Sequence, residues 1–129
     1  MLARPNTIET KYIKQLDPSV HPLAFNGFFD DHTSLFHIMD LECKQLTALE
    51  QDHLTICTLF YNTNVTPTVI DQYIAQIHEC NNKIAKLAIV GIPVGERPVF
   101  RLKLVKQEGL GFPYRFFSTV KEANDWLLT

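Results

Sequence analysis

The sequence predicts an α/β protein, a single domain in which helices cover a mostly parallel sheet of four or five strands. The first observation is the short apolar run Lys86–Ile92 (KLAIVGI), closed by Gly91, Pro93 and Gly95, which is typical of a strand buried on both faces. The second is that amphipathic helical patterns lie on either side of this run, as such a strand requires. The third is a chain of 129 residues with 46% hydrophobic and 20% charged residues, which is ordinary for one globular domain.

The first twenty residues are expected to lie outside the core, which we assign to residues 21–129. Residues Met1–Asn6 are expected to form a loose arm. Thr7–Leu16 alternates weakly between apolar and charged residues, which favours an edge strand whose lysines discourage pairing with another chain. A turn at Asp17-Pro18-Ser19 then leads into a first core strand at Leu23–Phe29.

The middle of the chain alternates between helix and strand patterns. Polar residues at positions 30–34 (DDHTS) precede a helical pattern over Leu35–Leu49, and Leu54–Tyr61 (LTICTLFY) is rich in the β-branched and aromatic residues of an interior strand. Thr66 can cap a helix that has Pro67 as its first residue, and apolar residues spaced three and four apart extend this helix to Lys83.

The stretch 97–108 admits two interpretations. Phe100–Leu104 alternates as a strand does, yet the apolar residues also form one helical face, and a proline near the start with glycines after the end favours a helix. A strand at Pro113–Ser118 and a helix opened by the capping box Thr119–Glu122 complete the pattern. Strands that alternate with helices imply a mainly parallel sheet with right-handed crossovers.

From about Leu23 to the end, the order of these patterns resembles the SpoIIAA-like branch of the STAS domains, whose core is also similar to the CRAL-TRIO lipid-carrier fold. Three segments carry the resemblance. FNGFFDDHTSLFHIMDLECKQL is similar to that family's strand, polar turn and helix, KLAIVG to its central strand, and FPYRFFSTVKEANDWLL to its closing strand and helix.

The resemblance implies a small non-catalytic regulatory or protein-interaction module in a bacterial cytoplasm, with a protein partner or a homodimer as its working form. The likeness to the CRAL-TRIO core implies an alternative function, a carrier or sensor of a lipid or another small apolar ligand held between helices and sheet.

Well-known members of that family are switched by phosphorylation of a serine at a helix N-terminus. The corresponding segment, Tyr61–Thr68 (YNTNVTPT), has neither the Asp-Ser pair nor the glycine of that motif, so the switch does not transfer with the resemblance. Thr63, Thr66 and Thr68 are candidate phosphoacceptors near the positive end of a helix dipole, although helix capping is the simpler role.

Two groups of residues are candidate ligand- or partner-binding sites. The turn Gly91–Gly95 follows the central strand, where open α/β sheets often bind anions, and this suggests a second alternative function, binding of a phosphate or nucleotide ligand. The turn lacks a Gly-x-Gly-x-x-Gly or Gly-Lys-Ser motif. Basic residues in the next stretch are expected to form one helix face suited to an acidic protein or an anionic head group: Arg97, Arg101, Lys103 and Lys106.

Metal, cofactor, enzymatic and nucleic-acid functions are not expected. A net charge of −2 gives no reason to expect nucleic acid, no arrangement of nucleophile and base is apparent, and no apolar run is long enough to span a membrane. The metal-capable residues Asp30, Asp31, His32, His37 and Asp40 suit helix capping better than a metal site. Without a C-x-x-C pair, the cysteines are expected to be small buried apolar residues: Cys43, Cys57 and Cys80.

Overall fold

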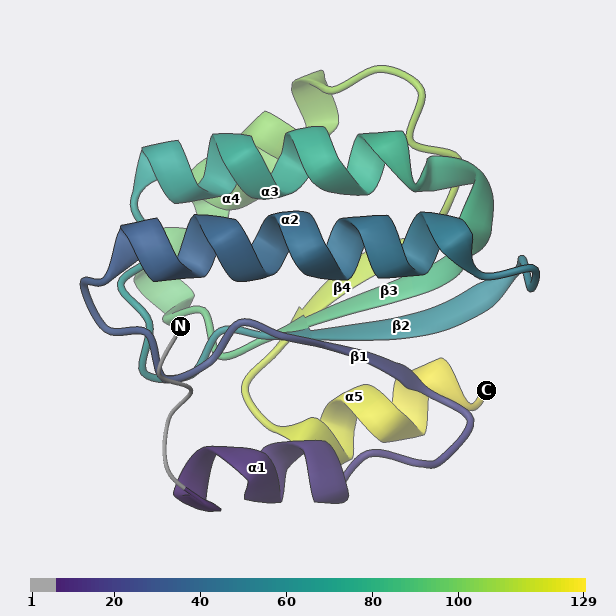
Figure 1. Ribbon diagram of the computed structural model, residues 1–129, viewed down its shortest axis with the longest axis horizontal. Coiled ribbons are helices and arrows are strands. Elements are labelled where there is room, and N and C mark those ends of the chain that lie inside the picture. Colours follow the sequence, from purple (N-terminus) through teal and green to yellow (C-terminus); the bar gives the residue numbers. More distant parts are fainter. Residues whose placement is uncertain (1–6) are drawn as a thin grey trace.

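The computed structural model describes residues 7–129 of the chain. These residues form a four-stranded sheet between two layers of helices (Figure 1). The strands are β1 (His21–Ala24), β2 (Leu54–Leu59), β3 (Ile84–Val90) and β4 (Tyr114–Phe117). They lie in the order β1-β2-β3-β4 and every neighbouring pair is parallel, which confirms the expected α/β class and parallel sheet. The expected loose arm, Met1–Asn6, lies outside the described residues.

Helices cover both faces of the sheet (Figure 1). On one face lie α2 (His32–Ala48), α3 (Pro67–Glu79) and α4 (Arg97–Lys106), each of which connects one strand to the next. On the other face lie α1 (Thr7–Lys14) and α5 (Val120–Leu127), which precede the first strand and follow the last. Short 3₁₀ turns at Asn81–Lys83 and Val94–Glu96 come directly before β3 and α4.

Strand β3 is buried on both faces, as its apolar run predicts. Leu87 and Ile89 belong to the core under α2, α3 and α4, whereas Ala88 and Val90 belong to the core under α1 and α5, and all four are 0% exposed. This alternation follows the pleat of the strand. Full burial of each larger side chain is worth roughly 1.5–3 kcal/mol, so β3 is a main source of the stability of the fold.

Strand β2 follows the same alternation and includes one polar side chain. Ile56, and Phe60 directly after the strand, face the core under α2 and α3, and Cys57 and Leu59 face the opposite core. Thr58 is fully buried, and its hydroxyl lies 2.6 Å from the Tyr73 hydroxyl of α3. Because each hydroxyl finds a partner in the other, a polar pair is accommodated inside an apolar core at little cost.

The prediction of an edge strand at Thr7–Leu16 is wrong, because this segment contains helix α1 and ends in a turn. Ile8, Tyr12 and Leu16 are spaced four apart, which is a helical spacing that the weak alternation concealed. Leu16 is buried in the core under α1 and α5, with Tyr12 and Ile13 packed against it. Packing of Tyr12 and Ile13 against this core stabilises a helix too short to persist alone in water.

The strand predicted at Leu23–Phe29 overlaps β1 only at Leu23 and Ala24, because β1 begins at His21 and ends at Ala24. The chain leaves the strand conformation after Ala24, and positive φ angles at Gly27 (82°) and Phe29 (51°) turn it towards α2. The backbone still bonds to the end of β2, since Gly27 N donates to Tyr61 O at 2.8 Å. The left-handed conformations of Gly27 and Phe29 therefore end the regular strand, although the chain stays hydrogen-bonded beside the end of β2.

The remaining predicted elements are confirmed, with small changes at their ends. The ambiguous stretch 97–108 is helical as favoured, although α4 ends at Lys106. The helix expected to reach Lys83 ends at Glu79, and a 3₁₀ turn separates it from β3. Such shifts of a few residues arise because helix ends depend on local caps that periodicity does not report.

Replacing Thr119 by Ala is expected to lower the free energy of unfolding by about 1 kcal/mol. The Thr119 hydroxyl accepts a hydrogen bond from Glu122 N at 3.2 Å, which is the cap that the capping box predicts, while the Glu122 carboxylate accepts from this hydroxyl at 3.0 Å rather than from the Thr119 backbone. Chemical denaturation measures the loss. Thr68→Ala, at an exposed position in the first turn of α3, is the control and is expected to cost nothing because Ala favours helix. Equal stability of Thr119→Ala and the wild type would contradict the capping role.

Candidate functional site

A cleft opens where the chain leaves β3 and β4 towards opposite faces of the sheet. After β3 the chain passes to α4 on one face, and after the neighbouring β4 it passes to α5 on the other (Figure 1). In α/β proteins, ligands bind in the crevice formed at the carboxyl ends of strands whose connections diverge in this way. The cleft has a volume of ≈ 270 Å³ and is lined by Tyr61, Gly91, Ile92, Pro93, Val94, Arg97 and Ser118.

Arg97 is the cationic group of this cleft. It is the first residue of α4, and its partly buried guanidinium donates from Nε to Ile92 O and from Nη2 to Ser118 Oγ, both at 3.0 Å. Among residues 11–129, whose side chains the structure describes, no carboxylate forms an ion pair with it. The guanidinium of Arg97 is therefore fixed in direction, and no carboxylate of residues 11–129 neutralises it at contact distance.

Tyr61 forms the wall of the cleft on the side of β2. Its hydroxyl donates to Ser118 O at 2.6 Å, and its ring stacks on Tyr12 of α1 with 4.2 Å between ring centroids. Burial raises the pKa of Tyr61 to about 12, so the phenol stays protonated and remains a hydrogen-bond donor at neutral pH. The cleft thus presents the Arg97 guanidinium and the Ser118 hydroxyl beside apolar surface, which suits a small anionic ligand.

The two glycines of the predicted turn have different roles. Gly91 has a φ angle of 98°, and a Cβ atom built on it would lie 2.7 Å from the backbone nitrogen of Tyr61. Gly95 is exposed, and a Cβ atom on it would meet nothing within 4 Å. Gly91 therefore allows the turn to pack against the end of β2, whereas Gly95 contributes no close contact.

The four basic residues predicted to form one face are not brought together. Arg97 points into the cleft, and Arg101 lies with its guanidinium carbon 5.3 Å from the centre of the Phe116 ring of β4. Lys103 reaches in the other direction, to Asp71 of α3 at 2.8 Å, across a groove of ≈ 350 Å³ that Lys106 also lines. Helix α4 thus carries an arginine edge towards β4 and a lysine edge towards α3.

Between these two edges α4 exposes an apolar stripe, which we call the α4 surface. It consists of Val99, Leu102 and Val105, whose exposed fractions are 51%, 55% and 67%. The residues are three apart and so follow one another along the same side of the helix. The opposite side of α4 is anchored in the core by Phe100 and Leu104. The periodicity of the sequence predicts one apolar helix face for all five of these residues, so it does not separate the exposed three from the buried two.

The candidate phosphoacceptors have separate surroundings. Thr63 Oγ1 donates to Phe25 O at 2.7 Å and accepts from Phe28 N at 3.1 Å, which ties two loops together. The Thr66 hydroxyl accepts from Val69 N at 3.3 Å and caps α3, as its position predicts. Thr68 is exposed in the first turn of that helix. Of the three, Thr68 alone has a solvent-exposed position.

The acidic and histidine residues around the start of α2 act as caps and loop contacts. Asp31 caps the helix by accepting from Ser34 N at 3.1 Å, and hydrogen bonds from the side chain and then the backbone of Ser34 lower the pKa of Asp31. Asp30 accepts from the Asn64 amide at 2.9 Å, while His32 contacts Asn64 O at 2.8 Å. Asp40 pairs with Lys44 at 2.9 Å. Among residues 11–129, no group of three or more His, Cys, Asp or Glu side chains is arranged to hold a metal ion.

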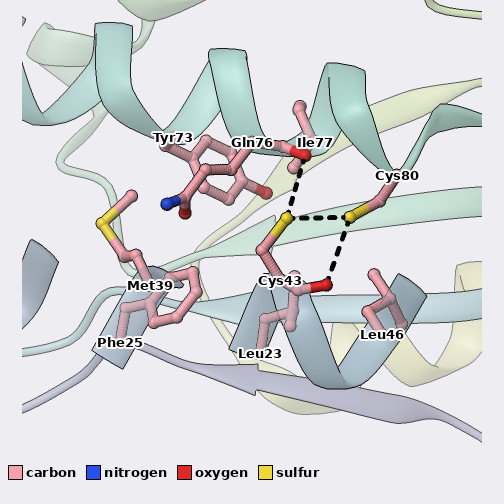
Figure 2. A pocket seen from close by; sticks show the side chains of 9 residues that line it. All are labelled: Leu23, Phe25, Met39, Cys43, Leu46, Tyr73, Gln76, Ile77 and Cys80. Carbon is pink, nitrogen blue, oxygen red and sulfur yellow. Dashed lines mark hydrogen bonds between the residues drawn. The ribbon is translucent and has the colours of Figure 1, made fainter. Parts of the chain in front are cut away.

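A second hollow lies between α2, α3 and β1, and its notable feature is a pair of sulfur atoms (Figure 2). Cys43 Sγ of α2 and Cys80 Sγ at the end of α3 are 3.1 Å apart. Sequence reasoning treated each cysteine separately, and their positions 37 residues apart gave no signal of contact. The hollow has a volume of ≈ 10 Å³, about the space of one water molecule, which is too little for an acyl chain in this conformation.

Comparison with protein-family models, with curated proteins and with solved structures finds no significant match. The kinship with SpoIIAA-like STAS domains therefore stays a prediction that rests on the three sequence segments. Of the helices in the described part of the chain, none has the length and apolar character needed to cross a membrane.

Replacing Gly91 by Ala is expected to lower the free energy of unfolding by about 2 kcal/mol or more, because the methyl group would collide with the backbone of Tyr61 in a strained conformation. Gly95→Ala is the matched control and is expected to stay within about 0.5 kcal/mol of the wild type. Thermal and chemical denaturation of both variants measure the difference. Equal stabilities would show that the turn does not pack against β2 as described.

Proposed function

We propose that this protein is a non-catalytic interaction module that docks an acidic protein segment on the α4 surface. The observation that carries the proposal is the exposure of more than half of each of Val99, Leu102 and Val105 on one side of a single helix. Such an aligned apolar stripe, bordered by charged residues, is typical of a site that recognises another protein.

The charges beside the stripe favour an acidic partner. Arg101 lies on one edge of the α4 surface and Lys106 on the other, and both are exposed. A partner with apolar residues in its centre and carboxylates at its margins would bury the stripe and pair with both cations. A second copy of this chain, docked helix to helix about a two-fold axis, would instead bring Arg101 and Lys106 against the same cationic helix, so a homodimer through this surface is disfavoured.

The buried state of the thiols supports a non-catalytic role. Burial raises the pKa of Cys57 and of Cys80 to about 12, which leaves little thiolate to act as a nucleophile at neutral pH. The alternation of strands and helices from β1 to α5 is compatible with the resemblance to SpoIIAA-like STAS domains. On the same resemblance we propose that the protein acts in a bacterial cytoplasm.

The double variant Leu102→Gln/Val105→Gln is expected to fold normally, because both side chains are more than half exposed, and to lose partner binding by about tenfold or more. The protein captured from the native host by the immobilised wild type is identified and purified, and its affinity for each variant is then measured by titration at two salt concentrations. Leu41→Gln, an exposed leucine on α2, is the matched control.

The proposal requires that the double variant binds more weakly, that the control binds normally, and that salt weakens the interaction. Equal affinity of the double variant and the wild type would remove the α4 surface as the docking site. An affinity that does not change with salt would remove the acidic character of the partner.

A second candidate function is the binding of a small phosphate- or carboxylate-bearing ligand in the cleft between β3 and β4. The observation that favours it is the guanidinium of Arg97, which is oriented by Ile92 O and Ser118 Oγ without a carboxylate partner among the described residues. An anion beside this side chain would gain a charge-assisted hydrogen bond in a partly buried position.

Titration of ¹⁵N-labelled protein with inorganic phosphate and with adenosine monophosphate tests this candidate. Saturable shifts are expected for the amides of Gly91, Val94 and Ser118, and Arg97→Gln is expected to abolish them. Arg115→Gln removes an exposed arginine from the face of β4 near Trp126 and is expected to leave them unchanged. Amide shifts that persist in Arg97→Gln would contradict a specific site. Shifts of similar size near every exposed basic residue would contradict it as well.

A further inference from the structure

We propose that Cys43 and Cys80 form a reversible disulfide bond that links α2 to the end of α3. The two sulfur atoms face each other across the hollow at 3.1 Å with no atom between them (Figure 2). A disulfide bond is about 2.0 Å long, so closure needs an approach of about 1 Å. Neither this bond nor its redox chemistry is required by docking at the α4 surface or by anion binding in the cleft, so the inference stands independently of both.

The other contacts of the two sulfur atoms are weak and do not compete with this closure. Cys43 Sγ lies 3.7 Å from Gln76 O and 3.8 Å from a carboxylate oxygen of Glu79, and Cys80 Sγ lies 3.7 Å from Cys43 O. The remaining walls of the hollow are mainly apolar side chains, among them Leu23, Leu46 and Ile77. The disulfide would therefore form without breaking a strong hydrogen bond.

Cys43 is the cysteine that an oxidant reaches first. It is 8% exposed compared with 1% for Cys80, and it lies beside Glu79, which is exposed on α3. Burial raises the pKa of Cys43 and raises that of Cys80 to about 12, so the reactive thiolate is scarce at neutral pH. Oxidation is consequently slow at neutral pH, and its rate rises with pH as the thiolate fraction grows.

Hydrogen peroxide is an oxidant small enough for this site. The Cys43 thiolate attacks one peroxide oxygen, the O–O bond breaks, and hydroxide leaves, which gives a sulfenic acid on Cys43. The Cys80 thiolate then attacks the Cys43 sulfur, the S–S bond forms, and the S–O bond breaks with loss of a second hydroxide. The two thiols together lose two electrons and two protons, and the peroxide becomes two water molecules. A dithiol such as dithiothreitol reverses the linkage by thiol–disulfide exchange.

Cys57 provides the internal control for this chemistry. It is 0% exposed and lies on β2 in the core under α1 and α5, on the opposite face of the sheet from the Cys43–Cys80 pair. Burial raises its pKa to about 12, as it does that of Cys80, so these two thiols are similar in acidity and differ in that only Cys80 lies beside another cysteine sulfur.

The test treats the reduced, folded wild-type protein with hydrogen peroxide, blocks the remaining thiols in denaturant with a maleimide, and measures intact mass and peptide maps. The three cysteines of the reduced protein are all labelled, whereas the oxidised protein is expected to accept one label, at Cys57, and to yield a peptide in which Cys43 is joined to Cys80. Dithiothreitol is expected to restore all three labels. Cys57→Ala should still form the bond, and Cys43→Ala and Cys80→Ala should not.

Three results would overturn the proposal: retention of all three labels after peroxide treatment, a crosslink that includes Cys57 or a second molecule, or stable sulfinic acid at Cys43 without a crosslink. The peptide map of the wild type decides among these outcomes by itself, so the conclusion does not depend on whether every alanine variant folds.

Discussion

Burial of β3 on both faces is the constraint on which the rest of the structure depends. A strand with no solvent-facing side needs helices on both faces of the sheet. The order of the strands determines which segments of the chain can supply the helices of each face. The strands lie in the order β1-β2-β3-β4, and all three crossover helices, α2, α3 and α4, lie on one face. The other face can then be covered only by segments outside the first and last strands, which are α1 and α5.

The same constraint determines where a ligand cleft can form. Because α5 must return to the face that the crossover helices leave open, the chain after β4 departs in the opposite direction from the chain after β3. The two strands remain paired up to Val90 and Phe117, and the connections that follow them diverge, with Arg97 on one and Ser118 on the other. The Arg97–Ser118 hydrogen bond spans the gap and gives the cleft a definite shape. The position of the cleft is therefore a consequence of topology rather than of a local motif.

Local signals in the sequence predicted most of the fold, and the failures concern contacts between distant segments. The burial of β3 and the helix caps at Thr66 and Thr119 are encoded within a few residues and are all present. Helix α1 was missed because a short amphipathic segment is helical only through its packing on the second face of the sheet. The turn at Gly91 was predicted from its residue type, but its partner Tyr61 comes from the register of β2 beside β3. The Cys43–Cys80 contact depends on how two helices pack side by side, which periodicity does not report.

The basic residues of α4 show how correct local spacing can still mislead. Arg97 and Arg101 are four apart and Lys103 and Lys106 three apart, so each pair shares a side of the helix. At 3.6 residues per turn, however, the centres of the two pairs are roughly 190° apart around the axis. One pair consequently faces β4 and the other faces α3, while Phe100 and Leu104 fill the inner side between them. The outer side is left to Val99, Leu102 and Val105.

What looks in sequence like one basic face is in space an apolar stripe with a cationic border on each side. Such a surface selects a partner by apolar complementarity in the centre and by charge at the margins, whereas a uniformly basic face would select by charge alone.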